Sequence, residues 1–179
     1  AFYGCISLIS ITIPALVTSI GNNAFAYCSA LTIVEYNAIN SFLGTFFPNS
    51  VKSFIIGNEV TTIPDYLCKG LDKITSIAIP NSVTSIGSHA FYGCNSITSV
   101  KYNAIKATIG LYNDGLFFNS VTSFTIGNEV TTIPDYLCKG LDKITSITIP
   151  NSVTEIGYYA FYGCSSLIFG VMPETLDVR

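Results

Sequence analysis

Apolar residues alternate with small polar residues over short stretches, and a proline or glycine closes each stretch. Within residues 8–20 the apolar positions that recur in other units are Leu8, Ile11, Ile13, Val17 and Ile20. Pro14 follows the second isoleucine, and the same frame recurs over 74–86 and 144–156. Alternation with a period of two predicts a short strand with one buried face, and the proline or glycine then turns the chain.

The pattern repeats along the whole chain at a spacing close to 23 residues. The first inward strand positions are Ile11, Val34, Phe54, Ile77, Val100, Phe124, Ile147 and Gly170. Three kinds of unit alternate, so that the complete cycle spans 66 and then 70 residues. Self-similarity at such a period is typical of solenoids. We expect a single domain over 1–179, with seven full units and a broken unit at each end, as a fragment of a longer array.

One unit alone cannot bury its apolar side. About eight inward groups per coil each contribute roughly 1.5 to 3 kcal/mol when fully buried. Stacking coils at the strand spacing of about 4.8 Å covers each apolar set with its copies above and below. The repeat therefore predicts that Ile11, Ile77 and Ile147 lie in one continuous row.

The unit "ITSITIPNSVTEIGYYAFYGC" at 144–164 and its near copy at 74–94 resemble the BspA-like leucine-rich repeats. They match at the strand, Pro, Ile-Gly, Ala-Phe and Cys positions together. The resemblance implies a strand-rich α/β, right-handed solenoid with one short parallel strand per coil, joined by short turns or helical turns. It also implies an extracellular or cell-surface location and an adhesion or protein-binding role. Tyr36 and Tyr102 depart from the family pattern, because they replace the second strand isoleucine.

Charge narrows the range of partners. Only 11% of residues are charged, and the net charge is −3. The chain therefore has no basic face to neutralise phosphates, and we expect no nucleic-acid partner. Polar residues interrupt every apolar stretch well short of the eighteen or so residues that a membrane span needs, so we expect no span in this segment.

The outward strand positions are the first candidate binding surface, because strand neighbours of an inward residue point to solvent. Most are serine or threonine, and the candidate contact residues on this face are Glu35, Ile55, Lys101 and Thr125. The alternative is a merely solvated face. Two irregular loops add aromatic residues, namely Phe42, Phe46, Phe47, Tyr112, Phe117 and Phe118. Tyr112 is the candidate contact there, although these aromatics equally suit core filling where the Ala-Phe pair is missing.

The sequence contains few candidate residues for catalysis or metal binding. The six cysteines include no C-x-x-C pair, so we expect free buried thiols and neither a metal nor a cofactor. The only histidine, His89, is expected at an ordinary exposed site, and Asp65 and Asp135 are expected on separate coils in solvent. Because no titratable groups converge, we expect no enzymatic activity.

Two hypotheses from different classes remain. The first is a binding module that presents its strand face or irregular loops to host, matrix or neighbouring surface proteins. The second is a structural spacer, in which the coils lengthen a stalk and recognition lies elsewhere. In addition, terminal coils normally need polar caps, so we expect end-to-end self-association.

Overall fold

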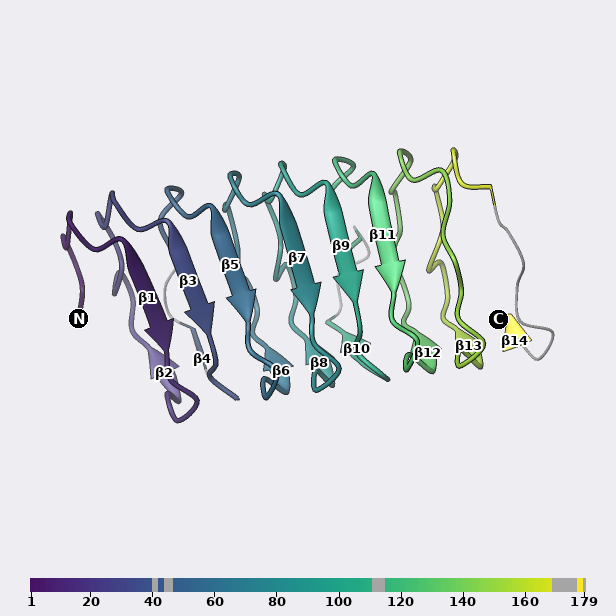
Figure 1. The fold of residues 1–179 in the computed structure, drawn as a ribbon, viewed down its shortest axis with the longest axis horizontal. Coiled ribbons are helices and arrows are strands. Elements are labelled where there is room, and N and C mark those ends of the chain that lie inside the picture. Colours follow the sequence, from purple (N-terminus) through teal and green to yellow (C-terminus); the bar gives the residue numbers. More distant parts are fainter. Residues whose placement is uncertain (40–41, 44–46, 111–114, 169–176, 179) are drawn as a thin grey trace.

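The coils stack into an elongated solenoid in this computed structural model (Figure 1). The structure describes residues 1–39, 42–43, 47–110, 115–168 and 177–178. Parallel four-residue strands form the front face: β1 (Ser10–Ile13), β3 (Ile33–Tyr36), β5 (Ser53–Ile56), β7 (Ser76–Ile79), β9 (Ser99–Tyr102) and β11 (Ser123–Ile126). Two-residue strands form a second row, here called the back strands: β2 (Ser19–Ile20), β4 (Phe42–Leu43), β6 (Thr62–Ile63), β8 (Ser85–Ile86), β10 (Thr108–Ile109), β12 (Thr132–Ile133), β13 (Glu155–Ile156) and β14 (Asp177–Val178).

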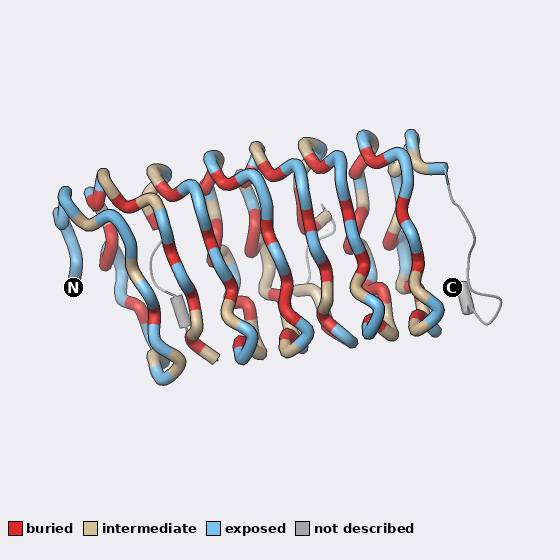
Figure 2. The backbone as a smooth tube through the Cα atoms, in the orientation of Figure 1, coloured by how far each residue is buried: buried red, intermediate tan, exposed pale blue. Residues whose placement is uncertain are grey.

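Burial alternates along the front strands, as the repeat pattern predicts. Strands β3, β5, β7, β9 and β11 all read exposed, buried, exposed, buried (Figure 2). Ile11 pairs in register with Val34, and Ile77 pairs with Val100, so equivalent residues stack along the solenoid axis. Tyr36 and Tyr102 keep the strand register and are fully buried, so these two substitutions do not alter the path of strands β3 and β9.

The expectation of helical turns finds no support, because the described residues contain no helix. The segment after Pro64 shows why. The amides of Leu67, Lys69 and Leu71 donate to carbonyls three residues earlier, whereas the amides between them donate to the next coil. Tyr66 and Gly70 have φ values of 58° and 76°, which a right-handed helix does not admit. We call this segment, and its equivalents in other coils, the arc.

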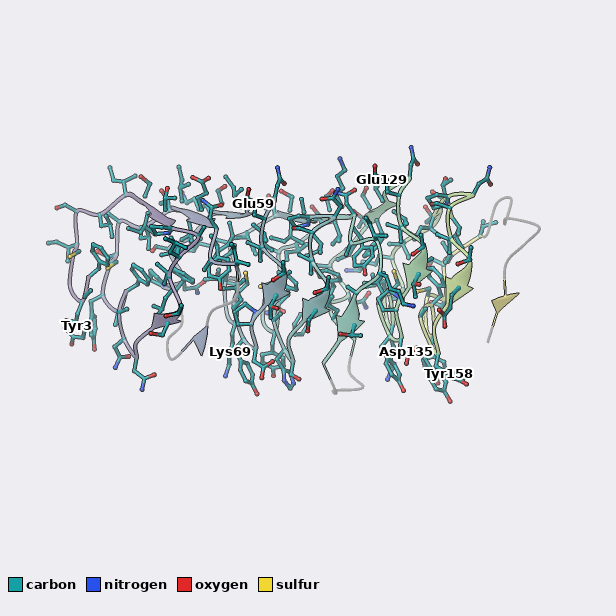
Figure 3. All side chains as sticks on the ribbon, turned by 90° about the horizontal axis from the view of Figure 1, so that it is seen from below. Tyr3, Glu59, Lys69, Glu129, Asp135 and Tyr158 are labelled. Carbon is teal, nitrogen blue, oxygen red and sulfur yellow. The ribbon has the colours of Figure 1, made fainter. Side chains whose placement is uncertain are left out.

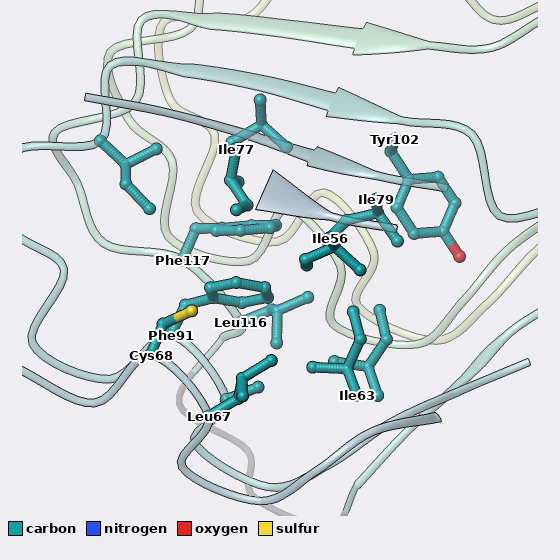
Figure 4. Packing of buried hydrophobic residues seen from close by; sticks show 14 of the residues in the cluster. Ile56, Ile63, Leu67, Cys68, Ile77, Ile79, Phe91, Tyr102, Leu116 and Phe117 are labelled. Carbon is teal, nitrogen blue, oxygen red and sulfur yellow. The ribbon is translucent and has the colours of Figure 1, made fainter. Parts of the chain in front are cut away.

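Aromatic residues of the irregular loops fill the core in the units whose sequence lacks the Ala-Phe pair. Phe47 and Phe117 are buried, and the Phe47 ring stacks on Phe25 at a centroid distance of 5.0 Å. The Phe117 ring stacks on Phe91 at 5.2 Å (Figure 4). The core-filling interpretation is therefore confirmed for these two residues. Phe118 is half-buried and meets the Tyr92 ring edge-on, while Phe46 and the side chain of Phe42 lie outside the described part.

The front strands form separate three-stranded sheets. Strands β1, β3 and β5 make one sheet and strands β7, β9 and β11 make another, with no pairing between β5 and β7. The back strands bridge this junction, because β6 pairs with β8. The three-unit cycle of the sequence therefore appears in the structure as a cycle in hydrogen bonding between coils.

Candidate partner-binding surfaces

The strand face carries four of the candidate residues predicted from sequence, and they lie at three separate places on it. Glu35 is exposed on β3, where Thr12 Oγ1 donates to its Oε2 at 3.1 Å and Asn37 Nδ2 donates to its Oε1 at 3.2 Å. These bonds hold the Glu35 carboxylate against its own face. A partner that binds Glu35 would have to compete with them.

Ile55 and Lys101 come together although they are 46 residues apart in the sequence. Both line a groove of about 360 Å³ over the junction between β5 and β7. Thr125 lines the equivalent groove, of about 260 Å³, between β11 and the segment 146–148. Tyr112 lies outside the described residues, so its candidate role stays a prediction.

A second surface, which sequence reasoning missed, runs along the arcs. We call it the tyrosine edge, and its exposed members are Tyr3, Tyr27, Tyr92, Tyr158, Tyr159 and Tyr162. In Figure 3, Tyr3 and Tyr158 lie along the edge opposite Glu59 and Glu129. Large exposed aromatic side chains gathered on one edge are the type of surface that anchors interfaces.

Ring contacts between coils hold the tyrosine edge in place. His89 stacks on Tyr66 at 5.3 Å, and Tyr159 stacks on Tyr136 at 5.6 Å. Lys139 Nζ lies 5.4 Å from the centroid of the Tyr136 ring, which is within the range of a cation–π contact. The expectation that His89 is an ordinary exposed residue is wrong, because it is half-buried within this stack.

A sequence signal for this edge was present. Tyrosine recurs in "AFYGC" at Tyr3, Tyr92 and Tyr162, and in "IPDY" at Tyr66 and Tyr136. The repeated phase places these residues on one side of the solenoid. The strand alternation alone does not show which way the arcs point, because an arc has neither helical nor strand period.

The described residues contain no cluster of side chains suited to hold a metal ion and no disulfide. Among them, no cluster of three or more histidine, cysteine, aspartate or glutamate side chains is arranged to hold a metal ion. The six cysteines are unbridged, and four of them, Cys28, Cys68, Cys94 and Cys138, are buried. In the same part of the chain no helix has the length and apolar character to cross a membrane.

Comparisons with known proteins agree with the repeat pattern. The family model described as the BspA type leucine rich repeat region matches residues 1–113 and 37–168, with 6 copies. No curated protein sequence matches the chain significantly.

Two solved structures show the same fold at low identity. A leucine-rich repeat protein of T. pallidum is 21% identical with a TM-score of 0.54, over 96% of this chain and 73% of that one. One from Eubacterium ventriosum is 22% identical with a TM-score of 0.56, over 95% of this chain and 56% of that one. The model match covers nearly the whole sequence, and the chain belongs to the BspA-type leucine-rich repeat family.

Proposed function

We propose that the chain is a non-enzymatic protein-binding or adhesion module of a cell-surface or secreted repeat protein. The observation that carries this proposal is the tyrosine edge on a hydrogen-bonded scaffold. Tyrosine supplies a large contact area with few rotatable bonds, so little entropy is lost when it meets a partner. The extracellular or surface location rests on the family resemblance. The partners are host, matrix or neighbouring surface proteins.

The binding test compares the two surfaces. The chain is screened by surface plasmon resonance against extracellular-matrix and cell-surface proteins, and each hit is measured with two variants. The edge variant carries Tyr27→Ser, Tyr158→Ser and Tyr162→Ser, and the matched face variant carries Glu35→Lys and Lys101→Glu. We expect the edge variant to weaken binding more than about tenfold and the face variant to weaken it less, because anchoring aromatics dominate interface energetics.

Two outcomes would redirect the proposal. If the face variant has the larger effect, the site belongs to the strand face with Ile55, Lys101 and Thr125, as first predicted. If no protein binds, the structural spacer becomes the better account, and the small exposed serines of the front strands favour that alternative. Circular dichroism of both variants shows whether the fold is retained.

Self-association is a separate proposal that rests on the N-terminal coil. Leu8, Ile11 and Val17 are only partly buried, whereas Ile74, Ile77 and Val83 at the same phase are buried. Apolar side chains also line a groove of about 400 Å³ at this end. We expect light scattering to show oligomers that grow with concentration, and Val17→Lys to reduce them because a charge in an apolar contact is costly. A strict monomer at high concentration would contradict this.

A further inference from the structure

The front face is interrupted at two equivalent places, one complete sequence cycle of 70 residues apart. The first is the junction between β5 and β7. At the second, 146–149 keep the alternation of exposed and buried residues but form no strand beside β11. Across both junctions the back strands remain paired, β6 with β8 and β12 with β13.

We call a junction between coils closed where the front strands are paired and open where they are not. The residue that follows each front strand explains where the open junctions lie. At the four closed junctions this residue donates its amide to the coil before it, through the bonds Asn37 N to Ile13 O, Gly57 N to Tyr36 O, Asn103 N to Ile79 O and Gly127 N to Tyr102 O. At the two open junctions the residue is Pro80 or Pro150. Proline has no amide hydrogen to donate and is tolerated in sheets only where a ladder bond is absent.

The arcs close tightly at the same two junctions. The amides of Tyr66, Cys68 and Gly70 donate to carbonyls of the next coil at 3.1, 2.7 and 2.8 Å. The equivalent amides of Tyr136, Cys138 and Gly140 do so at 3.0, 2.8 and 2.8 Å. Each open junction is therefore bonded along its arc and back strand and unbonded along its front.

The open fronts are the two grooves of the strand face. The first is lined by residues of both separated strands, including Ser53, Ile55, Ser76 and Ala78. The second is lined by their copies, including Ser123, Thr125, Ser146 and Thr148. Because the gap recurs at the same position of the sequence cycle, we look for its cause in the sequence. The residue after the front strand is proline at both gaps and asparagine or glycine at the paired junctions.

We propose that Pro80 and Pro150 set two hinge lines in the solenoid. Blocks of coils rock about the bonded arcs and back strands, and the front grooves open and close as they do so. Each block is held internally by a continuous front ladder, such as β7, β9 and β11. The strand face thereby adjusts its curvature at two defined lines rather than along its whole length. This inference does not depend on the proposed binding function.

Amide hydrogen exchange tests the hinge lines in the unaltered protein. In a parallel ladder alternate amides face the preceding strand, so Ser76 and Ala78 in β7 correspond to Ser99 and Lys101 in β9. We expect Ser76 and Ala78 to exchange at least about tenfold faster, because their amides have no ladder partner across the open junction. Equal protection at the two sets of amides would overturn the inference.

Restoring the missing donor tests the cause. Pro80→Asn introduces the residue that closed junctions carry at Asn37 and Asn103, and Pro80→Gly introduces the one they carry at Gly57 and Gly127. We expect either variant to slow exchange at Ser76 and Ala78 about tenfold and to leave Ser99 and Lys101 unchanged. Fast exchange at Ser76 and Ala78 in a folded variant would show that proline is not the cause.

Distance measurements test the rocking itself. Spin labels at Thr12→Cys and Thr125→Cys lie five coils apart, about 24 Å at the strand spacing. Cys5→Ser and Cys164→Ser remove the two native cysteines that are not buried. We expect pulsed electron resonance to give a distance distribution that narrows when Pro80→Asn is added. A width that does not change would overturn the hinge.

Discussion

Replacing Gly87 by alanine is expected to lower the free energy of unfolding by about 3 kcal/mol, the upper part of the range for overpacked sites. The same change at Gly21 is expected to alter it by no more than about 0.5 kcal/mol. Both glycines follow an isoleucine at the same phase of the repeat. The two substitutions differ in effect because an added Cβ at Gly87 would meet the preceding coil, whereas one at Gly21 would meet no atom within 4 Å.

Gly87 lies directly against the backbone of the preceding coil. A Cβ atom there would overlap the amide nitrogen and Oδ1 of Asp65 and would lie 2.6 Å from the carbonyl carbon of Pro64. Two bonds between the coils, Gly87 N to Ile63 O and Ser88 N to Asp65 Oδ1, are both 2.7 Å long. Because backbone cannot rotate aside as a side chain does, the methyl group would force the coils apart.

Gly21 is the matched control, because an added Cβ there meets no atom within 4 Å. Urea unfolding followed by circular dichroism gives the midpoint for each variant. A third variant, Gly157→Ala, should behave like Gly87→Ala, since its Cβ would meet Asp135 and lie 2.9 Å from the carbonyl carbon of Pro134. Equal shifts for Gly21→Ala and Gly87→Ala would show that the close approach of coils is not what selects glycine.

The stacking of coils was predictable because it depends on a strong local signal. Alternation of apolar residues around Ile77 and Ile147, repeated at near-constant spacing, requires that equivalent residues cover one another. The register of Ile77 with Val100 follows from counting residues. Burial of Phe47 and Phe117 was likewise open to prediction, since a missing Ala-Phe pair leaves volume to fill.

The direction of the arcs and the role of Asp65 were not predictable in the same way. Asp65 and Asp135 were expected on separate coils in solvent, and Asp65 is indeed exposed. The unpredicted feature is that its carboxylate also accepts the amide of Ser88 from the next coil. Such contacts depend on how closely two coils approach. Alternation along a single coil contains no information on that distance, and the stack of Tyr66 on His89 was missed for the same reason.

The largest loss of stability is expected at alkaline pH, where ionisation of the buried cysteine thiols favours the unfolded state. Burial raises the pKa of Cys94 from its ordinary value of 9.0 to about 12. Burial also raises the pKa of Cys68 and Cys138 well above that value, with a smaller contribution from the neighbouring thiols Cys94 and Cys164 respectively. The folded state therefore keeps these thiols neutral at pH values where the unfolded chain ionises them.

The raised pKa of these thiols means that the free energy of unfolding falls as the pH rises. Below pH 9 the thiols are neutral in both states, so their contribution to stability is fully present. Between pH 9 and 12 only the unfolded state loses its protons, and stability falls throughout this interval. For Cys94 alone the loss reaches roughly 4 kcal/mol at the upper limit, and the other buried thiols add to it. We expect cooperative unfolding within this interval, measured as urea midpoints at successive pH values.

Cys94→Ser isolates the thiol from the other groups that titrate in this range. The thiol of Cys94 donates to the carbonyl of Cys68 at 3.0 Å, and a serine hydroxyl keeps this donor without ionising in the same interval. The variant should be less stable at neutral pH, because it loses apolar volume, but its stability should fall less steeply above pH 9. Thiolate absorbance should rise together with the loss of native circular dichroism. If the absorbance of buried thiols rose while the fold persisted, the solenoid would admit water between its coils, and stacking would not be what keeps these groups neutral.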